Sequence, residues 1–132
     1  VPRRARPHAA VIAMRRAAVL LALVSLAAAP GPGWAHAFPD HSEPRVGHTL
    51  DAPPPTVRIW FDGALEPVFS QIRVEDSGQR RVDKGDSRVD PADPTLLEVS
   101  LPALTPGRYT VIWSVVARDG HRTEGRFPFR IK

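Results

Sequence analysis

YTVIWSVV, residues 109–116, is the strongest indication of the fold in this sequence. It is apolar at nearly every position, and a short apolar run of this kind is typical of a buried strand. We therefore predict a central strand that is covered on both faces. Asp119-Gly120-His121 follows at the point where this strand ends.

Apolar and polar residues alternate in four further runs around this stretch. Alternation with a period of two turns one row of side chains inward and the other toward water. Proline, glycine and aspartate mark the turns between the runs, and no helix of normal length fits after position 36. The chain is therefore predicted to be all-β, a β-sandwich or small barrel of short strands. The expected inward residues are Val57, Ile59, Phe61, Ile72, Val74, Leu97, Val99, Leu101, Phe127, Phe129 and Ile131.

Three positions add detail to this prediction. LTPGRY at 104–109 resembles a tyrosine corner, in which the hydroxyl of Tyr109 bonds back to the loop before its strand. Pro128 cannot donate a backbone hydrogen bond, so we place it at a strand edge or a bulge. Glu98 alternates with inward residues and is expected to face water.

Residues 1–35 have the pattern of a signal peptide. A basic start at Met14-Arg15-Arg16 precedes 13 small and apolar residues, and Gly33 and Ala35 are small residues at the −3 and −1 positions of a cleavage site. A membrane-spanning helix needs about 20 residues. We therefore expect cleavage before His36 and export to the periplasm, with an uncleaved anchor as the alternative.

This division makes residues 36–132 the single folded domain. The residues before Met14 are interpreted as a mis-called start or an extended basic region, and the two arginines alone do not separate Sec from twin-Arg export. Ninety-seven residues suffice for one modest core.

The charge balance changes once residues 1–35 are set apart. The chain has 18 lysines and arginines against 14 acidic residues, but five of the basic residues and none of the acidic ones precede position 36. Residues 36–132 therefore carry 13 basic and 14 acidic groups. The sequence contains no basic patch with interleaved aromatic residues, so it gives no reason to expect nucleic acid as a partner. The absence of cysteine excludes disulfides and thiolate metal sites.

His36 is the first candidate metal ligand, because cleavage would free its α-amine. The amine and Nδ1 of an N-terminal histidine can close a chelate ring on one ion, and an α-amine with a pKa of about 7.7–8.0 loses its proton readily at neutral pH. A second imidazole or a carboxylate would complete a nitrogen and oxygen set that favours Cu(II). The alternative is that His36 merely follows the cleavage site.

Asp119-Gly120-His121 is the second candidate. Residues i and i+2 of an extended segment point to one side, so the carboxylate and the imidazole can reach one ion together. The alternative is a turn in which Asp119 accepts a hydrogen bond and His121 is solvated. His41 and His48 are expected to be solvated, and Asp62 is expected to be a surface carboxylate, although it could supply one more oxygen.

The sequence of 36–132 resembles the CopC family of periplasmic copper-binding proteins. The resemblance covers nearly all of these residues, and the ordered combination of motifs is more specific than any single one. The motifs are HA at 36–37, SEPRVG at 42–47, VRIWF at 57–61, EPVFS at 66–70, LTPGRY at 104–109, YTVIWSVVARDGH at 109–121, EG at 124–125 and FPF at 127–129.

The resemblance implies a seven-stranded, Ig-like Greek-key sandwich or barrel. It also implies a Cu(II) site formed by the amine and imidazole of His36 with Asp119 and His121, one copper ion per chain. A membrane copper importer of the CopD type is the partner that it implies, and the protein is expected to be a monomer.

Two departures from the family pattern narrow this expectation. The only methionine is Met14, so residues 36–132 contain no thioether for a Met-rich Cu(I) site. Many members carry Ser-Glu after the strand that ends here in Phe61, whereas this chain has Asp62-Gly63. The fourth equatorial ligand is therefore left open, with water as one choice.

The leading functional hypothesis is a periplasmic Cu(II)-binding protein that sequesters or transfers copper without substrate turnover. Metal binding is expected to weaken in acid, because the ligands must lose their protons. Two other classes compete with it. One is a copper-dependent oxidative enzyme built on the N-terminal histidine, and the other is a metal-free Ig-like interaction domain. The last of these predicts that His36 lies far from Asp119 and His121.

Overall fold

The computed structural model describes residues 36–132, and every structural statement below concerns these residues. The predicted signal peptide, residues 1–35, lies outside the described residues. Within 36–132, no helix is long and apolar enough to cross a membrane.

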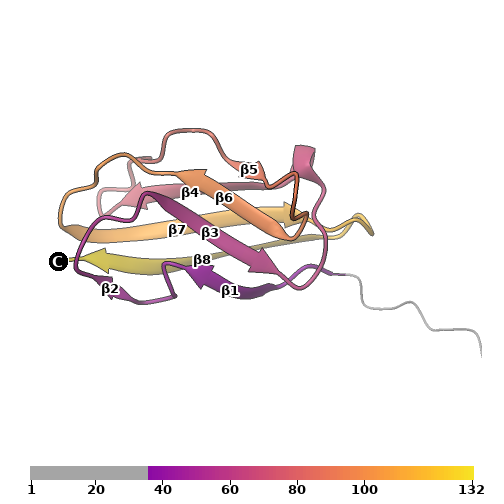
Figure 1. Ribbon diagram of the computed structural model, residues 1–132, viewed down its shortest axis with the longest axis horizontal. Helices are drawn as coiled ribbons and strands as arrows, with labels where there is room; N and C mark the ends of the chain where they lie inside the picture. The colour runs from indigo at the N-terminus through magenta and orange to yellow at the C-terminus, as the bar shows by residue number, and fades with distance from the viewer. Residues whose placement is uncertain (1–35) are drawn as a thin grey trace, which may run out of the picture. The chain divides into compact units, whose positions relative to one another are not determined.

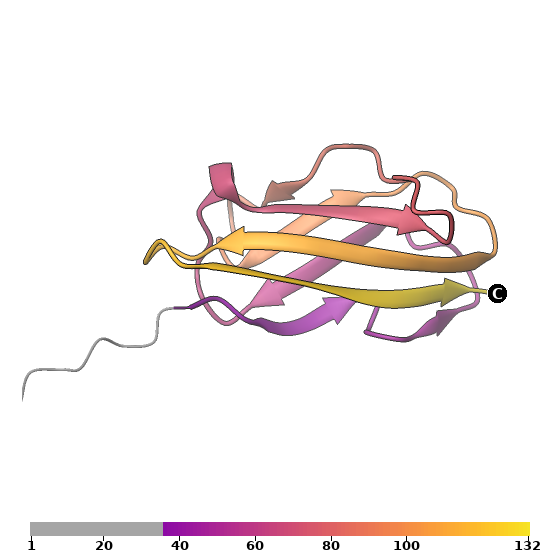
Figure 2. The ribbon, with the colours of Figure 1, turned by 180° about the vertical axis from the view of Figure 1, so that it is seen from behind.

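The described chain consists of strands joined by turns, with one short 3₁₀ helix. The strands form two four-stranded sheets with the orders β1-β3-β6-β5 and β2-β8-β7-β4. Figures 1 and 2 show the two sheets as facing layers, with the β7–β8 hairpin running the length of the molecule. The elements are β1 Pro39–Glu43, β2 Thr49–Leu50, β3 Thr56–Phe61, η1 Pro67–Phe69, β4 Gln71–Asp76, β5 Arg88–Val89, β6 Leu96–Ser100, β7 Gly107–Val116 and β8 Arg122–Ile131.

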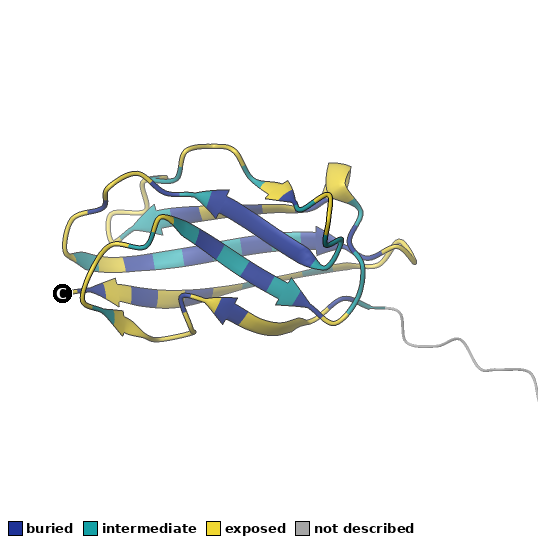
Figure 3. Ribbon diagram, in the orientation of Figure 1, coloured by how far each residue is buried: buried dark blue, intermediate teal, exposed yellow. Residues whose placement is uncertain are grey.

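The predicted all-β sandwich is confirmed. The paired strands are antiparallel except for β2 and β8, which are parallel. All eleven side chains predicted to point inward are buried, and Figure 3 shows burial alternating along β3 and β8. Residues 36–132 form eight strands, one more than the family resemblance implies. Two of them, β2 and β5, are two residues long and are too short to show any alternation in the sequence.

The central strand differs from the prediction in one respect. β7 lies between β8 and β4, as a central strand should. Its outer face, however, is not covered, because Thr110, Ile112 and Ser114 are only half-buried. The described residues supply no third layer on that side of the sheet, so the apolar residue Ile112 remains partly exposed.

Glu98 was expected to face water, and this prediction is wrong. Glu98 is only 6% exposed. Arg58 Nε lies 3.1 Å from one carboxylate oxygen, and Arg88 donates to the other across 2.8 Å. Long arginine side chains from the two neighbouring strands therefore cover the carboxylate on the outer face.

The tyrosine corner is confirmed, since the Tyr109 hydroxyl donates to the Thr105 carbonyl at 2.6 Å. At Pro128, the antiparallel pairing of β8 with β7 continues without interruption. The Pro128 carbonyl accepts from Gly47 N–H at 2.7 Å, on the side away from β7. The missing N–H of Pro128 lies on that same side, because both groups of one residue in a strand point the same way.

Trp113 and Gly125 form a cross-strand pair on the inner face of β7 and β8. Trp113 is 8% exposed and packs edge-on against Phe61, with ring centroids 5.2 Å apart. A Cβ atom placed on Gly125 would lie 2.6 Å from Trp113 Cζ2. The absence of a side chain at Gly125 therefore gives the indole its place between the sheets.

Candidate metal centre

The turn between β7 and β8 carries two of the predicted ligands at one end of the sandwich. Ala117 N–H donates to the His121 carbonyl, and Gly120 N–H donates to the Ala117 carbonyl. Gly120 has φ +89°, a left-handed conformation that glycine adopts without strain. The turn folds back tightly, and so Asp119 and His121 lie side by side.

Asp119 and His121 interact directly in this turn. One Asp119 oxygen accepts the His121 backbone N–H at 2.9 Å, and the other lies 2.9 Å from His121 Nδ1. The pKa of Asp119 is lowered, first by this backbone hydrogen bond, then by the His121 side chain, with the charge of His36 acting in the same direction. An ionised carboxylate that holds Nδ1–H leaves Nε2 of His121 available to a metal ion.

The turn that the sequence offers as the alternative to a metal site is thus present, with Asp119 as acceptor. It does not separate the two side chains from His36. A turn and a ligand pair are compatible here, because the hydrogen bonds of the turn aim the carboxylate and the imidazole at the same space.

His36 reaches this space from the segment that leads into β1. Ala37 is fully buried, and its carbonyl accepts the Thr123 hydroxyl at 2.7 Å. Phe38 N–H donates to Asp62 Oδ1 at 2.7 Å, and Asp62 N–H donates to the Phe38 carbonyl at 2.9 Å. The half-buried His36 therefore directly precedes two residues that hydrogen bonds hold in place.

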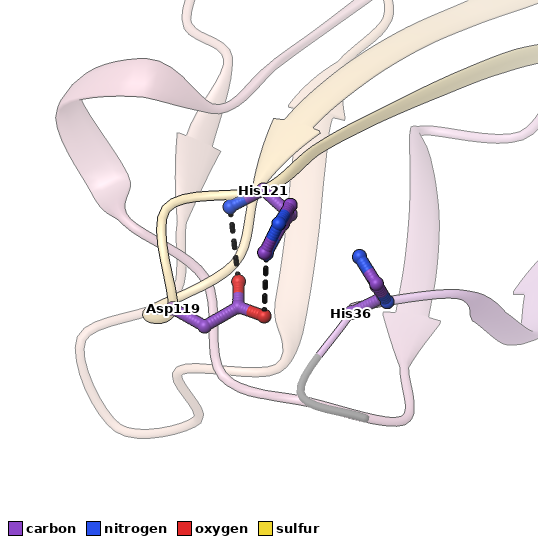
Figure 4. A group of neighbouring side chains, drawn as sticks. All are labelled: His36, Asp119 and His121. Atoms are coloured by element: carbon purple, nitrogen blue, oxygen red, sulfur yellow. Dashed lines mark hydrogen bonds and ion pairs between the residues drawn. The ribbon is translucent and has the colours of Figure 1, made fainter. Parts of the chain in front are cut away.

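The structure brings the three predicted ligands together. One donor atom from each of His36, Asp119 and His121 lies within 4.8 Å of the others. Figure 4 shows the His36 ring facing the Asp119–His121 pair, and the two imidazole centroids are 4.4 Å apart. Imidazole nitrogen binds a metal such as zinc at about 2.0–2.1 Å, so ligands on opposite sides of one ion lie about 4 Å apart. The cluster needs only a small contraction to enclose an ion.

His41 and His48 do not join this group, and residues 36–132 contain no other cluster of three such ligands. His41 stacks on Trp60, with centroids 4.4 Å apart and planes 8° apart, and its Nδ1 lies 2.8 Å from Asp40. His41 was expected to be solvated; its side chain is 57% exposed and packs one ring face on the tryptophan.

Sequence reasoning missed the residues that hold the N-terminal segment. Asp62 was expected to be a surface carboxylate; it is exposed, but one of its oxygens accepts the Phe38 amide. No local pattern marks Thr123, since its hydrogen bond to Ala37 joins residues 86 positions apart in the chain. Its only sequence signal is its position two residues after His121, on the same side of an extended chain.

Comparison with known proteins supports one family. The family model described as the CopC domain matches residues 40–132. Protein YobA of Escherichia coli K12 is 32% identical over 100 residues, which make up 75% of this chain and 81% of that protein. Copper transport protein CutJ of Bacillus subtilis 168 is 30% identical over 113 residues, which are 85% of this chain but 21% of that longer protein.

Solved structures agree in fold. The crystal structure of CopC from Methylosinus trichosporium OB3b has a TM-score of 0.66 at 31% identity, and the match covers 74% of this chain and 94% of that one. PcoC from Escherichia coli, described as a methionine-rich copper resistance protein, has a TM-score of 0.63 at 26% identity, covering 74% and 100%.

Proposed function

This chain belongs to the CopC family, and we propose that it binds a single Cu(II) ion in the periplasm and sequesters or transfers it. The observation that carries the proposal is the cluster of His36, Asp119 and His121, whose donor atoms lie within 4.8 Å of one another. The residues come from two distant parts of the sequence. Only a folded chain brings them together.

The donor set supports copper in its oxidised form. Two imidazoles and a carboxylate are the ligand types that suit Cu(II), and the α-amine of His36 adds a third nitrogen once residues 1–35 are removed. Residues 36–132 contain no methionine or cysteine, so they offer no soft sulfur ligand for Cu(I). We therefore propose one site per chain and no Met-rich site of the kind that the name of PcoC suggests for that protein.

Asp62 contributes to this site indirectly. One of its oxygens accepts the Phe38 amide and so helps to hold the segment that carries His36. The α-amine, two imidazole nitrogens and one Asp119 oxygen make four equatorial donors, so we propose that any bound water is a fifth ligand. Export, cleavage before His36, a monomeric state and a CopD-type membrane partner belong to the same proposal. The name of CutJ, a copper transport protein of which this chain matches 21%, supports a role beside transport.

Cu(II) titration tests whether the α-amine of His36 is a ligand. It compares the protein that begins at His36, called the processed protein below, with a form that carries one extra residue before His36. The extra residue converts the amine to an amide and leaves all side chains in place. We expect the extended form to bind Cu(II) at least about tenfold more weakly, the equivalent of about 1.4 kcal/mol. His48→Ala serves as the control, because His48 lies outside the ligand cluster, and it should bind as tightly as the processed protein.

Equal affinity in the processed and extended forms would contradict a role for the amine. Unchanged affinity in His121→Ala would contradict the site itself. The proposal also states that copper is bound and released without turnover. Oxidase or peroxygenase activity of the copper-loaded protein that His121→Ala abolishes would replace the binding role with an enzymatic one.

A further inference from the structure

The proposed copper site is divided between the two sheets of the sandwich. Asp119 and His121 belong to the β7–β8 turn, whereas His36 precedes β1 at the edge of the other sheet. Figures 1 and 4 show the two parts meeting at one end of the molecule. A contact that ties one sheet to the other at this end would therefore fix the distance between the two groups of ligands.

One peptide group makes that tie. The carbonyl between Ala37 and Phe38 accepts the Thr123 hydroxyl of β8 at 2.7 Å. The N–H of the same peptide group donates to Asp62, directly after β3, at 2.7 Å. Because a peptide group is planar and rigid, hydrogen bonds at both of its ends fix its orientation. Ala37, fully buried, then directs His36 toward the turn.

The peptide group between Ala37 and Phe38, together with its hydrogen-bond partners Thr123 and Asp62, forms a clamp. The two sides of this clamp have different roles. On the side of β3, the reciprocal Phe38–Asp62 hydrogen bonds extend the β1–β3 ladder, in which Pro39 pairs with Phe61. They keep the segment on its own sheet. Thr123 binds the segment from the opposite sheet. It stands two residues after His121, so both side chains point toward the N-terminal segment.

We propose that Thr123 is a positioning residue for the copper site, and that its hydroxyl holds His36 within reach of Asp119 and His121. This inference rests on the proposed function for its copper readout. It assigns a role to a residue that touches no metal ion. The clamp itself is a property of the metal-free protein and can be measured without copper.

The test uses two substitutions in the processed protein. Thr123→Val removes the hydroxyl but keeps the branched shape that suits a strand, and Thr123→Ser keeps the hydroxyl. We expect Cu(II) affinity to fall about tenfold in Thr123→Val, the loss of about one hydrogen bond, and to stay within about twofold in Thr123→Ser. Thr110→Val, in the neighbouring strand β7, is the matched control and should leave affinity unchanged.

Two further readouts separate positioning from general destabilisation. The electron paramagnetic resonance spectrum of bound Cu(II) should show one species in the unaltered protein and in Thr123→Ser, and a mixture in Thr123→Val. In the metal-free protein, hydrogen exchange of the Phe38 amide should be about tenfold faster in Thr123→Val, while β7 amides keep their protection.

The outcomes decide the two proposals separately. If the unaltered protein fails to bind Cu(II), the proposed function is wrong, and Phe38 exchange still decides whether Thr123 holds the segment. If copper binds but Thr123→Val matches the unaltered protein in affinity, spectrum and exchange, the positioning role is overturned. Equal losses in Thr123→Val and Thr123→Ser would overturn it as well, because the hydroxyl would then not be the group that matters.

Discussion

At the scale of single residues, the environment of several polar side chains depends on their hydrogen-bond and ion-pair partners rather than on the alternating pattern of the sequence. Glu98 follows the alternating pattern in position but not in environment, because arginines of the neighbouring strands close over it. Asp62 and Asp119 both accept backbone amides, and each fixes one part of the candidate site. Sequence patterns identify such residues as polar but cannot identify their partners, since those partners depend on the register of the strands.

Asp83 offers a residue-scale prediction about pH. Its side chain is fully buried. Burial acts to raise its pKa, but hydrogen bonds from Arg81, Val74 N–H and Gly85 N–H outweigh burial, and the pKa of Asp83 is lowered. A lowered carboxyl pKa stabilises the folded state above the unfolded value, about 3.9, and this contribution disappears as pH falls through the folded pKa.

Asp83→Asn should therefore lower the free energy of unfolding by about 1–3 kcal/mol at pH 7. The difference from the unaltered protein should shrink as pH falls below about 4, where Asp83 of the unfolded chain takes up a proton, and should be lost once the folded protein is protonated there too. Urea denaturation of the metal-free proteins at pH 7 and pH 3 measures both effects. A difference that stays constant between the two pH values would contradict a role for the charge of Asp83.

At the scale of elements, the sequence predicts strands better than it predicts their ends and surroundings. The strand at 109–116 and the four alternating runs are all present. β8 begins at Arg122, four residues before the predicted alternating run that starts at Arg126, because its first half pairs with β7 without an alternating apolar face. The open outer face of β7 could not be predicted either, since an apolar residue such as Ile112 gives no sign of whether another layer covers it.

The pairing of Trp113 with Gly125 gives an element-scale prediction. Gly125→Ala would place a Cβ 2.6 Å from the indole, so the ring or the strand must move. Overpacking of this kind costs about 1–3 kcal/mol. We expect a lower urea midpoint and a changed near-ultraviolet circular dichroism signal. Gly63→Ala is the control: its Cβ would make ordinary contacts at 3.8 Å, and its stability should change by less than about 0.5 kcal/mol.

At the scale of the whole molecule, the candidate site depends on topology. The sequence alone identifies His36, Asp119 and His121 as candidate metal ligands. The signals are the freed amine, the i and i+2 spacing and the family resemblance. It cannot show that residues more than 80 positions apart meet. The order of the two sheets places the start of β1 beside the β7–β8 turn, and this arrangement brings the donors within 4.8 Å. A metal-free domain that kept these residues apart does not agree with the observed geometry.

A ligand that binds only the folded state should stabilise the whole sandwich. At a free Cu(II) concentration of one hundred times the dissociation constant, stability rises by about 2.7 kcal/mol. For a domain of this size that gain raises the melting temperature by about 10–20 °C. Scanning calorimetry of the processed protein should show this rise, and His121→Ala should lose most of it. A rise of the same size in His121→Ala would mean that copper binds elsewhere.

The long strand β8 leaves the β7–β8 turn and ends near the C-terminus at the far end of the sandwich (Figure 1). Lys132 forms an exposed ion pair with Asp51 there, at 2.7 Å. Any polypeptide attached after Lys132 therefore starts about one full strand length away from the ligands. A purification tag or a surface tether belongs at this end, where immobilised protein would present the proposed metal site to solution, whereas a tag left before His36 would take the place of the proposed amine ligand.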